Sequence, residues 1–210
     1  TGQMKLSTGL TKNRTYHLGA IDEATGIRLY TLRFPDEAAV VARFTAAGLP
    51  APDFKDAGGA RSAFVKDPGG FNLQLVIDPA ASGRGVDVGI NVSDLARSRS
   101  FYRDFAGLEE LPPVEDAALG VTRFPFRHGE TTISLWQAGA KPARDTGSAG
   151  IQYVVGNVYA VNAAAKAQNV AVETPLGGVR GFDVVTVWLN DPDGVTNYFY
   201  QRIPRRAAAK

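Results

Sequence analysis

Cysteine is absent from this sequence, and its absence narrows the chemistry that the chain can perform. No disulfide, thiolate metal site or cysteine nucleophile can form. Without cysteine, the composition also does not indicate whether the protein's compartment is oxidising or reducing. Long apolar runs are missing too. None approaches the roughly 20 residues that span a bilayer, and no signal-peptide pattern opens the chain. We therefore expect a soluble protein without a membrane partner and favour the cytoplasm.

A large excess of either charge is also missing. Lysine and arginine number 23 and aspartate and glutamate 21, which leaves a net charge of +2. This balance argues against nucleic acid as a partner. The 44% of hydrophobic and 21% of charged residues are typical of a globular protein. A chain of 210 residues can bury a stable core as one large domain or two small ones.

Two similar turn sequences, one in each half of the chain, indicate an internal repeat. They are Asp67-Pro68-Gly69-Gly70 and Asp191-Pro192-Asp193-Gly194. Each joins two apolar segments, as expected of a hairpin turn. Upstream of each turn the sequence predicts a strand followed by a helix, at 27–34 and 38–47 in one case and at 151–155 and 158–168 in the other.

A third copy of this pattern lies between the two turns. Residues 87–92 alternate as in a strand, Ser93-Asp94 is a helix cap, and Gly107 ends the helix. Strands are expected at 121–126 and 131–136. Residues 3–20 are interpreted as the closing strands of a first, incomplete copy. With a linker at 79–85, we expect an N-terminal module at 1–80 and a C-terminal module of two units at 84–203.

The segment Gly89-Ile90-Asn91-Val92-Ser93-Asp94, with Phe101-Tyr102 and the two Asp-Pro turns, resembles the βαβββ unit of the vicinal oxygen chelate superfamily. This superfamily comprises glyoxalases, bleomycin resistance proteins and extradiol dioxygenases. The resemblance implies an α+β fold in which tandem βαβββ units pair into curved mixed sheets that enclose a cavity. A function does not follow from a fold.

The resemblance also implies where a divalent ion would be held, namely by histidine, glutamate or glutamine on the first and last strands of paired units. In this sequence those positions are Leu29 and Gln74 in the second unit, Asp87 and Ser134 in the third, and Gly150 and Tyr198 in the fourth. Serine and tyrosine are uncommon ligands, and glycine has no side chain. Neither His17 nor His128 lies at a ligand position. We therefore predict no bound metal, only degenerate metal positions, and no other cofactor.

Strand alternation identifies the side chains that would line the cavity, because residues two apart share a face. Arg180, in the glycine-rich segment 177–181, is expected on a loop at the rim, where it can meet an anionic ligand. A mixed aromatic and polar wall suits a flat or sugar-like organic molecule. The predicted ligand-binding residues are Asp87, Asn91, Ser134, Trp136, Gln152, Tyr198, Tyr200 and Arg180.

Three functions remain open from the sequence. The leading hypothesis is a metal-independent protein that binds a small organic molecule in the C-terminal module. The first alternative is an enzyme, a lyase, ring-cleaving dioxygenase or isomerase, with Asp87 as a base beside Tyr198 or with a remodelled metal site. The second is a structural module whose cavities are filled by Trp136, Tyr198 and Tyr200. A homodimer that supplies the missing first unit is also open.

Overall fold

The computed structural model describes residues 24–67, 70–82, 85–139, 142–144 and 150–203. The predicted strands within 3–20 and His17 lie outside these residues. In the part of the chain that is described, no helix has the length and apolar character needed to cross a membrane.

The second unit begins the described chain and has the predicted strand, helix and meander. Asp36 caps the helix, since its Oδ1 accepts a hydrogen bond of 2.8 Å from the backbone N–H of Ala38. Gly48 follows the helix with φ +69°, a conformation that favours glycine. The elements are β1 (Gly26–Phe34), α1 (Glu37–Ala46), β2 (Lys55–Ala57), β3 (Ala60–Lys66) and β4 (Asn72–Ile77).

The third unit repeats this order with an additional short strand. Its helix starts at the predicted cap, where Asp94 accepts from the N–H of Arg97 at 3.0 Å, and continues as a single π-helical segment. Phe101 and Tyr102 on this helical segment are both buried. The elements are β5 (Asp87–Asn91), α2 (Leu95–Ser100), η1 (Phe101–Phe105), β6 (Glu109–Glu110), β7 (Val114–Asp116), β8 (Val121–His128) and β9 (Thr131–Trp136).

The fourth unit closes the described chain. Asn157 caps its helix through a 3.0 Å hydrogen bond from the N–H of Ala160, and Asn169 after the helix has φ 54°, as its residue type predicts. The elements are β10 (Gly150–Val154), α3 (Val158–Ala167), β11 (Val172–Gly178), β12 (Val184–Asn190) and β13 (Thr196–Arg202).

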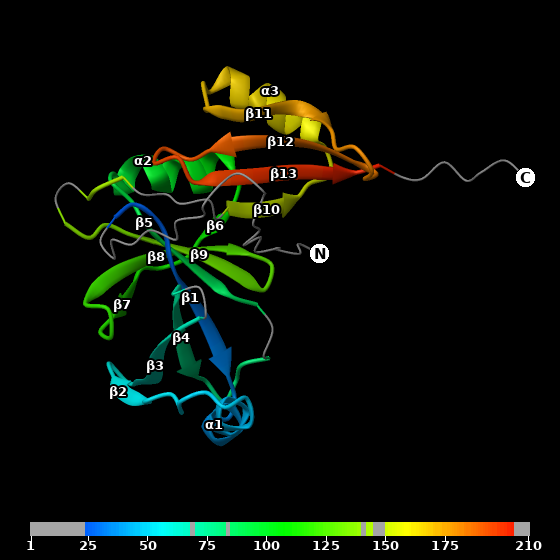
Figure 1. Cartoon of the computed structure of the whole chain (residues 1–210). Helices are drawn as coiled ribbons and strands as arrows, with labels where there is room; N and C mark the ends of the chain where they lie inside the picture. The colour runs from blue at the N-terminus through cyan, green and yellow to red at the C-terminus, as the bar shows by residue number, and fades with distance from the viewer. Residues whose placement is uncertain (1–23, 68–69, 83–84, 140–141, 145–149, 204–210) are drawn as a thin grey trace, which may run out of the picture.

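Two sheets result, and the larger one joins the second and third units. Its nine strands follow the order β2-β3-β4-β1-β5-β9-β8-β6, with β7 paired to β8. The joint is an antiparallel pairing of β1 with β5 that places Thr31 opposite Asp87. The fourth unit forms a separate sheet with the order β10-β13-β12-β11. Figure 1 shows this smaller sheet and α3 on one side of the larger sheet, with α1 at the opposite end.

This pairing crosses the boundary between the two expected modules. The third unit, which we expected to combine with the fourth in the C-terminal module, shares its sheet with the second. The physical reason is that the first strand lies at the edge of every unit, so β1 and β5 each offer unpaired backbone groups on that edge. Hydrophobic alternation carries no information about which of two such edges will meet.

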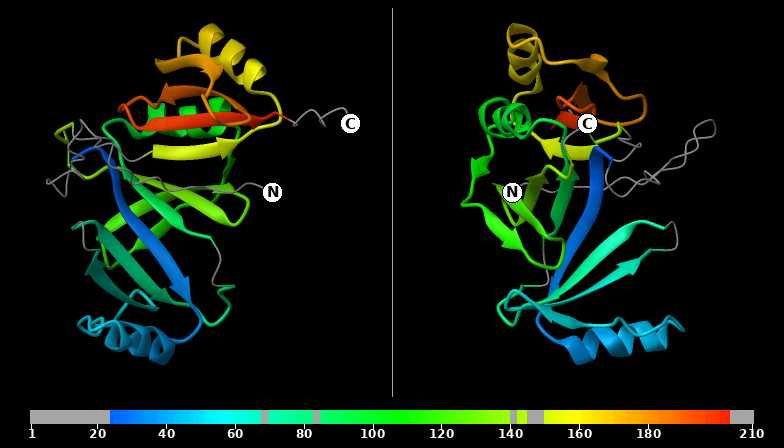
Figure 2. Two further views of the ribbon diagram at one scale, coloured as in Figure 1. Left: turned by 45° about the vertical axis from the view of Figure 1, so that its right-hand side comes forward. Right: turned by 90° about the vertical axis from the view of Figure 1, so that its left-hand side faces the viewer.

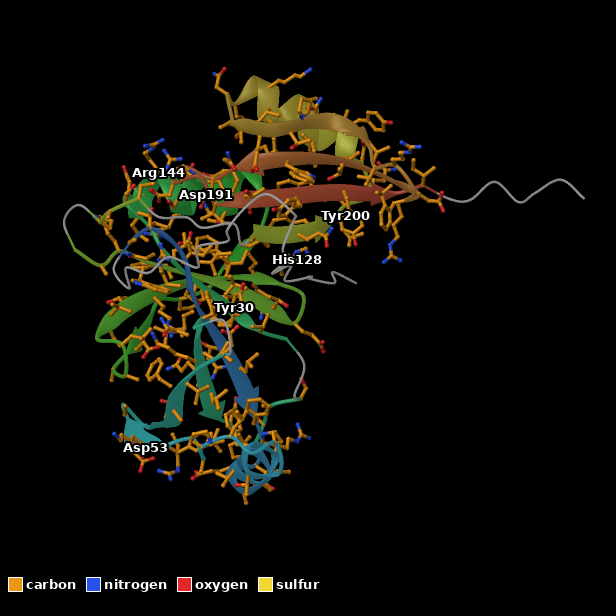
Figure 3. All side chains as sticks on the ribbon, in the orientation of Figure 1. Tyr30, Asp53, His128, Arg144, Asp191 and Tyr200 are labelled. Carbon is orange, nitrogen blue, oxygen red and sulfur yellow. The ribbon has the colours of Figure 1, made fainter. Side chains whose placement is uncertain are left out.

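The aspartates that open the two Asp-Pro segments make the same hydrogen bond. Asp67 and Asp191 each accept a hydrogen bond of 2.8 Å from the N–H four residues later, which confirms the repeat. The second turn also docks the fourth unit on the third: Tyr102 donates to Asp191 Oδ2 at 3.0 Å, and the Ser93 hydroxyl donates to Asp193. Figure 3 places Asp191 near α2, and Figure 2 shows the two sheets from other sides.

One apolar cluster extends from the larger sheet to the smaller one. It includes Tyr102 and Phe126 of the third unit and Tyr153 and Phe199 of the fourth. The rings of Tyr153 and Phe199 are stacked, with their centroids 4.7 Å apart. A second cluster lies under α1, around Val40 and Leu75. In the large sheet, both clusters are formed by every second side chain along a strand, so they lie on the same face. The side chains between them point to the opposite face of the sheet.

Candidate functional site

A row of mostly polar side chains crosses the middle of this second face. Strand register places five residues side by side, from β3 across β4, β1 and β5 to β9: Phe64, Gln74, Thr31, Asp87 and Thr132. Their chain neighbours, such as Ala63 and Leu75, belong to the apolar cluster on the opposite face. The row therefore faces away from α1.

Asp87 is the acceptor at the centre of this row. Its Oδ1 accepts hydrogen bonds from the hydroxyls of Thr132 at 2.8 Å and Ser134 at 2.7 Å. Its Oδ2 accepts one from the Arg123 guanidinium at 2.9 Å. Three of about four acceptor positions of the carboxylate are thus used. A buried carboxylate requires such partners, because desolvation without them is costly.

Arg123 is the only cation that pairs with Asp87 among the described residues. It lies on β8 and reaches over β9, and it is 5% exposed. Its Nη1 donates to Thr31 Oγ1 at 3.1 Å as well as to Asp87, while its Nη2 donates to Gln74 Oε1 at 2.9 Å. Nη2 also forms an ion pair of 2.5 Å with Asp116 Oδ2. One guanidinium therefore joins four strands.

Asp116 connects this network to the contact that closes the sheet. Its Oδ1 accepts from the N–H of Leu119 at 3.0 Å and shapes the turn between β7 and β8. In that turn, the Cβ of Ala117 lies 3.0 Å from the position that a Cβ on Gly58 would take, in the turn between β2 and β3. Turns from both arms of the large sheet therefore meet, so the sheet curves around the polar face; β2 and β7 lie on the same side of the molecule (Figure 1).

Trp136 covers part of the polar face. A Cβ on Gly89 would lie 2.6 Å from Trp136 Cζ3, so the indole lies directly over this glycine. The ring is buried, and the Arg123 guanidinium carbon is 5.9 Å from its centroid, within the range of a cation–π contact. Phe64, in contrast, is 45% exposed on the same face. The face thus has one packed and one open aromatic side chain.

The structure divides the predicted ligand-binding residues between the two sheets. Asp87, Ser134 and Trp136 share the polar face of the large sheet. Asn91 is buried and holds structure, because its amide donates to Ala24 O at 3.1 Å and accepts from Ala138 N–H at 2.8 Å. The remaining residues lie in the fourth unit: Gln152, Tyr198, Tyr200 and Arg180.

In the described part of the chain, the side-chain partners of Asp87 come from β8 and β9 of the third unit. Tyr198 lies over Gly150, since a Cβ there would be 2.2 Å from Tyr198 Cε2, and its ring meets Trp188 at 4.9 Å. Tyr200 is labelled on the smaller sheet in Figure 3. Arg180 is exposed in the turn between β11 and β12. Asp87 and Tyr198 belong to different sheets, and their combination in one site stays a prediction.

His128 is at the end of β8, away from the predicted metal positions. Its ring centroid is 5.6 Å from that of Tyr153, and its Nε2 is buried without a partner among the described residues. Burial lowers the pKa of this imidazole.

The metal positions of the second and third units do converge, but their side chains do not fit a divalent ion. Leu29, Gln74, Asp87 and Ser134 share one face, and Leu29 provides no donor. The carboxylates of Asp87 and Asp116 are both paired with Arg123. No group of three or more histidine, cysteine, aspartate or glutamate side chains in the described part of the chain could hold a metal ion. A second cation beside the guanidinium would be repelled.

Three residues of the network were missed from the sequence: Thr31, Arg123 and Asp116. A signal for Arg123 was present, because it alternates with Phe124 and Phe126 in a strand and so had to face Ser134 and Trp136. The other two follow only from pairing β1 with β5 and β7 with β8.

Comparisons with known proteins bear on the same region. Residues 85–199 match the family model described as Glyoxalase/Bleomycin resistance protein/Dioxygenase superfamily. No curated protein matches the sequence of this chain. Among solved structures, glyoxalase I from Zea mays is similar with a TM-score of 0.70 and 20% identity, over 85% of this chain and 68% of that one. A putative dioxygenase from Bacillus subtilis has a TM-score of 0.62 and 13% identity, over 85% and 63%. These likenesses show the fold.

Proposed function

Since this chain belongs to the glyoxalase/bleomycin resistance protein/dioxygenase superfamily, we propose that it binds a small organic molecule without a divalent metal ion. The observation that carries the proposal is the Arg123 guanidinium, which lies among the side chains at the family's metal positions and pairs with both nearby carboxylates. Coordination needs several free, convergent donors, and here they are engaged.

The polar face of the large sheet is the proposed binding surface. It combines the half-exposed ring of Phe64 with hydrogen-bonding groups such as Gln74 in the same cross-strand row. An aromatic surface beside a few fixed polar groups favours a flat ligand with polar substituents. The fourth unit's residues, including Tyr198 and Arg180, are not needed for this surface, which combines β1, β3 and β4 of the second unit with β5 and β9 of the third.

The enzymatic alternative has less support. As a general base, Asp87 would have to exchange a present hydrogen bond for one to substrate, because Arg123, Thr132 and Ser134 already use most of its acceptor capacity. Asp87→Asn should abolish turnover if that alternative holds. The structural alternative is supported by one observation, the packing of Trp136 over Gly89.

The binding proposal is tested by a thermal-shift screen of flat polar organic molecules, with Phe64→Ala as the test variant. A hit should raise the Tm of the native chain and lose most of its effect in this variant. The matched control is Phe182→Ala, which removes a 71% exposed phenyl ring from the turn between β11 and β12. A screen without any shift would favour the structural alternative.

The metal part of the proposal has its own measurement. Elemental analysis of the native protein should find far less than one divalent ion per chain, and a chelator should leave the Tm unchanged. About one tightly held ion per chain would overturn the proposal, because weak sites lose their metal during purification.

A further inference from the structure

We propose that Arg123 is a built-in cation in a cradle of four oxygen atoms, and that removing its side chain turns this cradle into a binding site for Ca²⁺. The inference deepens the proposed function in one respect, since both assume that the native chain holds no metal. It does not depend on the organic ligand.

The cradle consists of oxygen atoms alone. Each contacts a terminal guanidinium nitrogen of Arg123, at distances of 2.5 to 3.1 Å. Two are carboxylate oxygens, one is an amide carbonyl oxygen and one is a hydroxyl oxygen. The four atoms are Asp87 Oδ2, Asp116 Oδ2, Gln74 Oε1 and Thr31 Oγ1. Such a set matches hard cations, which prefer oxygen ligands.

Four strands supply these atoms, so the sheet fixes their relative positions. Thr31 is on β1, Gln74 on β4, Asp87 on β5 and Asp116 on β7. The first three are fixed by register as adjacent partners. Thr132 and Ser134 hold the second oxygen of Asp87, so its orientation does not depend on the guanidinium alone. The cradle should therefore largely survive removal of the arginine.

Charge explains why a cation must be present. Asp87 and Asp116 are largely buried, with side chains 8% and 13% exposed, and Arg123 is the cation that pairs with both. One positive charge against two negative charges leaves a deficit, which a divalent ion would cancel. Without the guanidinium, two buried carboxylates would face each other, an arrangement that strongly favours capture of a cation or of protons.

The way Arg123 is held supports its role as a charge. Its Nε is buried and has no hydrogen-bond partner among the described residues. Only Nη1 and Nη2 contact the oxygen atoms of the cradle. The cradle therefore binds the charged end of the side chain and does not use all the N–H groups of the guanidinium. The oxygens surround a group wider than a single ion. Ca²⁺, with flexible coordination at about 2.3 to 2.6 Å, should fit this space better than Mg²⁺, which demands about 2.0 to 2.1 Å.

The experiment compares the native chain with Arg123→Ala after complete removal of metal. Isothermal titration with Ca²⁺ should show no binding to the native chain and about one ion per chain for Arg123→Ala. Ca²⁺ should also restore part of the Tm lost in this variant, and Mg²⁺ should restore less. The matched control is Arg127→Ala, which removes a half-exposed arginine of the same strand that pairs with Glu109. It should gain no Ca²⁺ binding.

Two further variants keep the test decisive if Arg123→Ala folds poorly. Arg123→Lys retains the charge and should not bind Ca²⁺. Adding Asp116→Ala to Arg123→Ala removes a donor oxygen and a negative charge and should abolish the gained binding. If Arg123→Ala refolds only with Ca²⁺, that dependence supports the proposal. A folded Arg123→Ala without Ca²⁺ binding overturns this inference alone, whereas a stoichiometric ion in the native chain overturns the proposed function as well.

Discussion

Asp87 and Arg123 form an ion pair of 2.9 Å across the middle of the large sheet, and both side chains are less than a tenth exposed. They lie on β5 and β8 with β9 between them, so the pair crosses an intervening strand. A buried pair of this kind contributes little net stability compared with apolar residues, but the loss of one partner leaves an uncompensated charge. Its energetics therefore differ from those of the surface pairs.

Asp87→Ala should destabilise the protein by about 2 to 4 kcal/mol, because the hydroxyls of Thr132 and Ser134 and one Arg123 nitrogen lose their acceptor, while Arg123 keeps its pair with Asp116. Urea unfolding measures the free energy. The control is Glu109→Ala, which breaks an exposed pair with Arg127 and should cost less than about 1 kcal/mol. Equal effects of the two substitutions would show that the buried network is not formed.

Gly89→Ala should destabilise the fold by about 1 to 3 kcal/mol and change the fluorescence of Trp136. The added Cβ would lie 2.6 Å from the indole, and 3.2 Å from Leu29 Cβ on the other side, so the ring must move. Gly156→Ala is the matched control, since a Cβ there meets nothing within 4 Å. Unchanged stability and emission for Gly89→Ala would contradict the placement of Trp136.

Asp191 makes the free energy of unfolding depend on pH in a direction opposite to that of most carboxylates. Burial is the main cause that raises its pKa from 3.8 to about 6 in the folded protein. The folded state therefore binds more protons than the unfolded state between these values. The contribution to stability is present below about pH 4 and is lost as the pH rises through 6, by about 3 kcal/mol in total.

The measurement is the difference in free energy of unfolding between the native chain and Asp191→Asn from pH 4 to 7. An asparagine keeps an acceptor for the N–H groups of Asp193 and Val195 without titrating. Relative to this variant, the native chain should lose stability as the pH rises. Tyr102→Phe removes a hydrogen bond that lowers the pKa of Asp191, so the transition should move to higher pH. A difference that stays constant across this range would refute the prediction.

The sequence predicted the local elements and the fold class, but it did not indicate which units share a sheet, for a physical reason. Caps such as Asp36 and Asn157 act within one turn of a helix, and alternation fixes which side chains share a face, so Asp87, Ser134 and Trp136 were correctly placed together. Their role in ligand binding stays a prediction. The hydrogen-bond network of Arg123 and Asp87 depends on which strand edges pair. Long-range contacts decide this pairing, and no local sequence pattern contains them.

Arg123 illustrates the same limit at a single residue. In sequence it is one of many arginines, and only its alternation with Phe124 and Phe126 could have indicated an inward direction. Its partners come from residues 31, 74, 87 and 116, which are brought together only by the curved sheet. The resemblance identified metal positions on the first and last strands of each unit. The cation that lies among them, the Arg123 guanidinium, comes instead from β8.

The contact between the turns at Gly58 and Ala117 can be tested by a disulfide, because the chain has no other cysteine. In the double variant Gly58→Cys/Ala117→Cys the two Cβ atoms would lie 3.0 Å apart. A disulfide requires about 3.5 to 4.5 Å, so a small separation of the turns allows the bond. The residue at 58 must also keep φ +58°, which costs a cysteine about 1 kcal/mol and lowers stability before oxidation.

We expect this double variant to lose its free thiols on mild oxidation as a monomer, which thiol titration and mass spectrometry would show, while each single variant keeps its thiol. The bond closes the two arms of the sheet over the polar face. If a ligand enters between these arms, the oxidised protein should bind a hit of the thermal-shift screen far more slowly than the reduced protein, with binding restored by a reductant. Free thiols that persist in the double variant would mean that the turns are apart in solution.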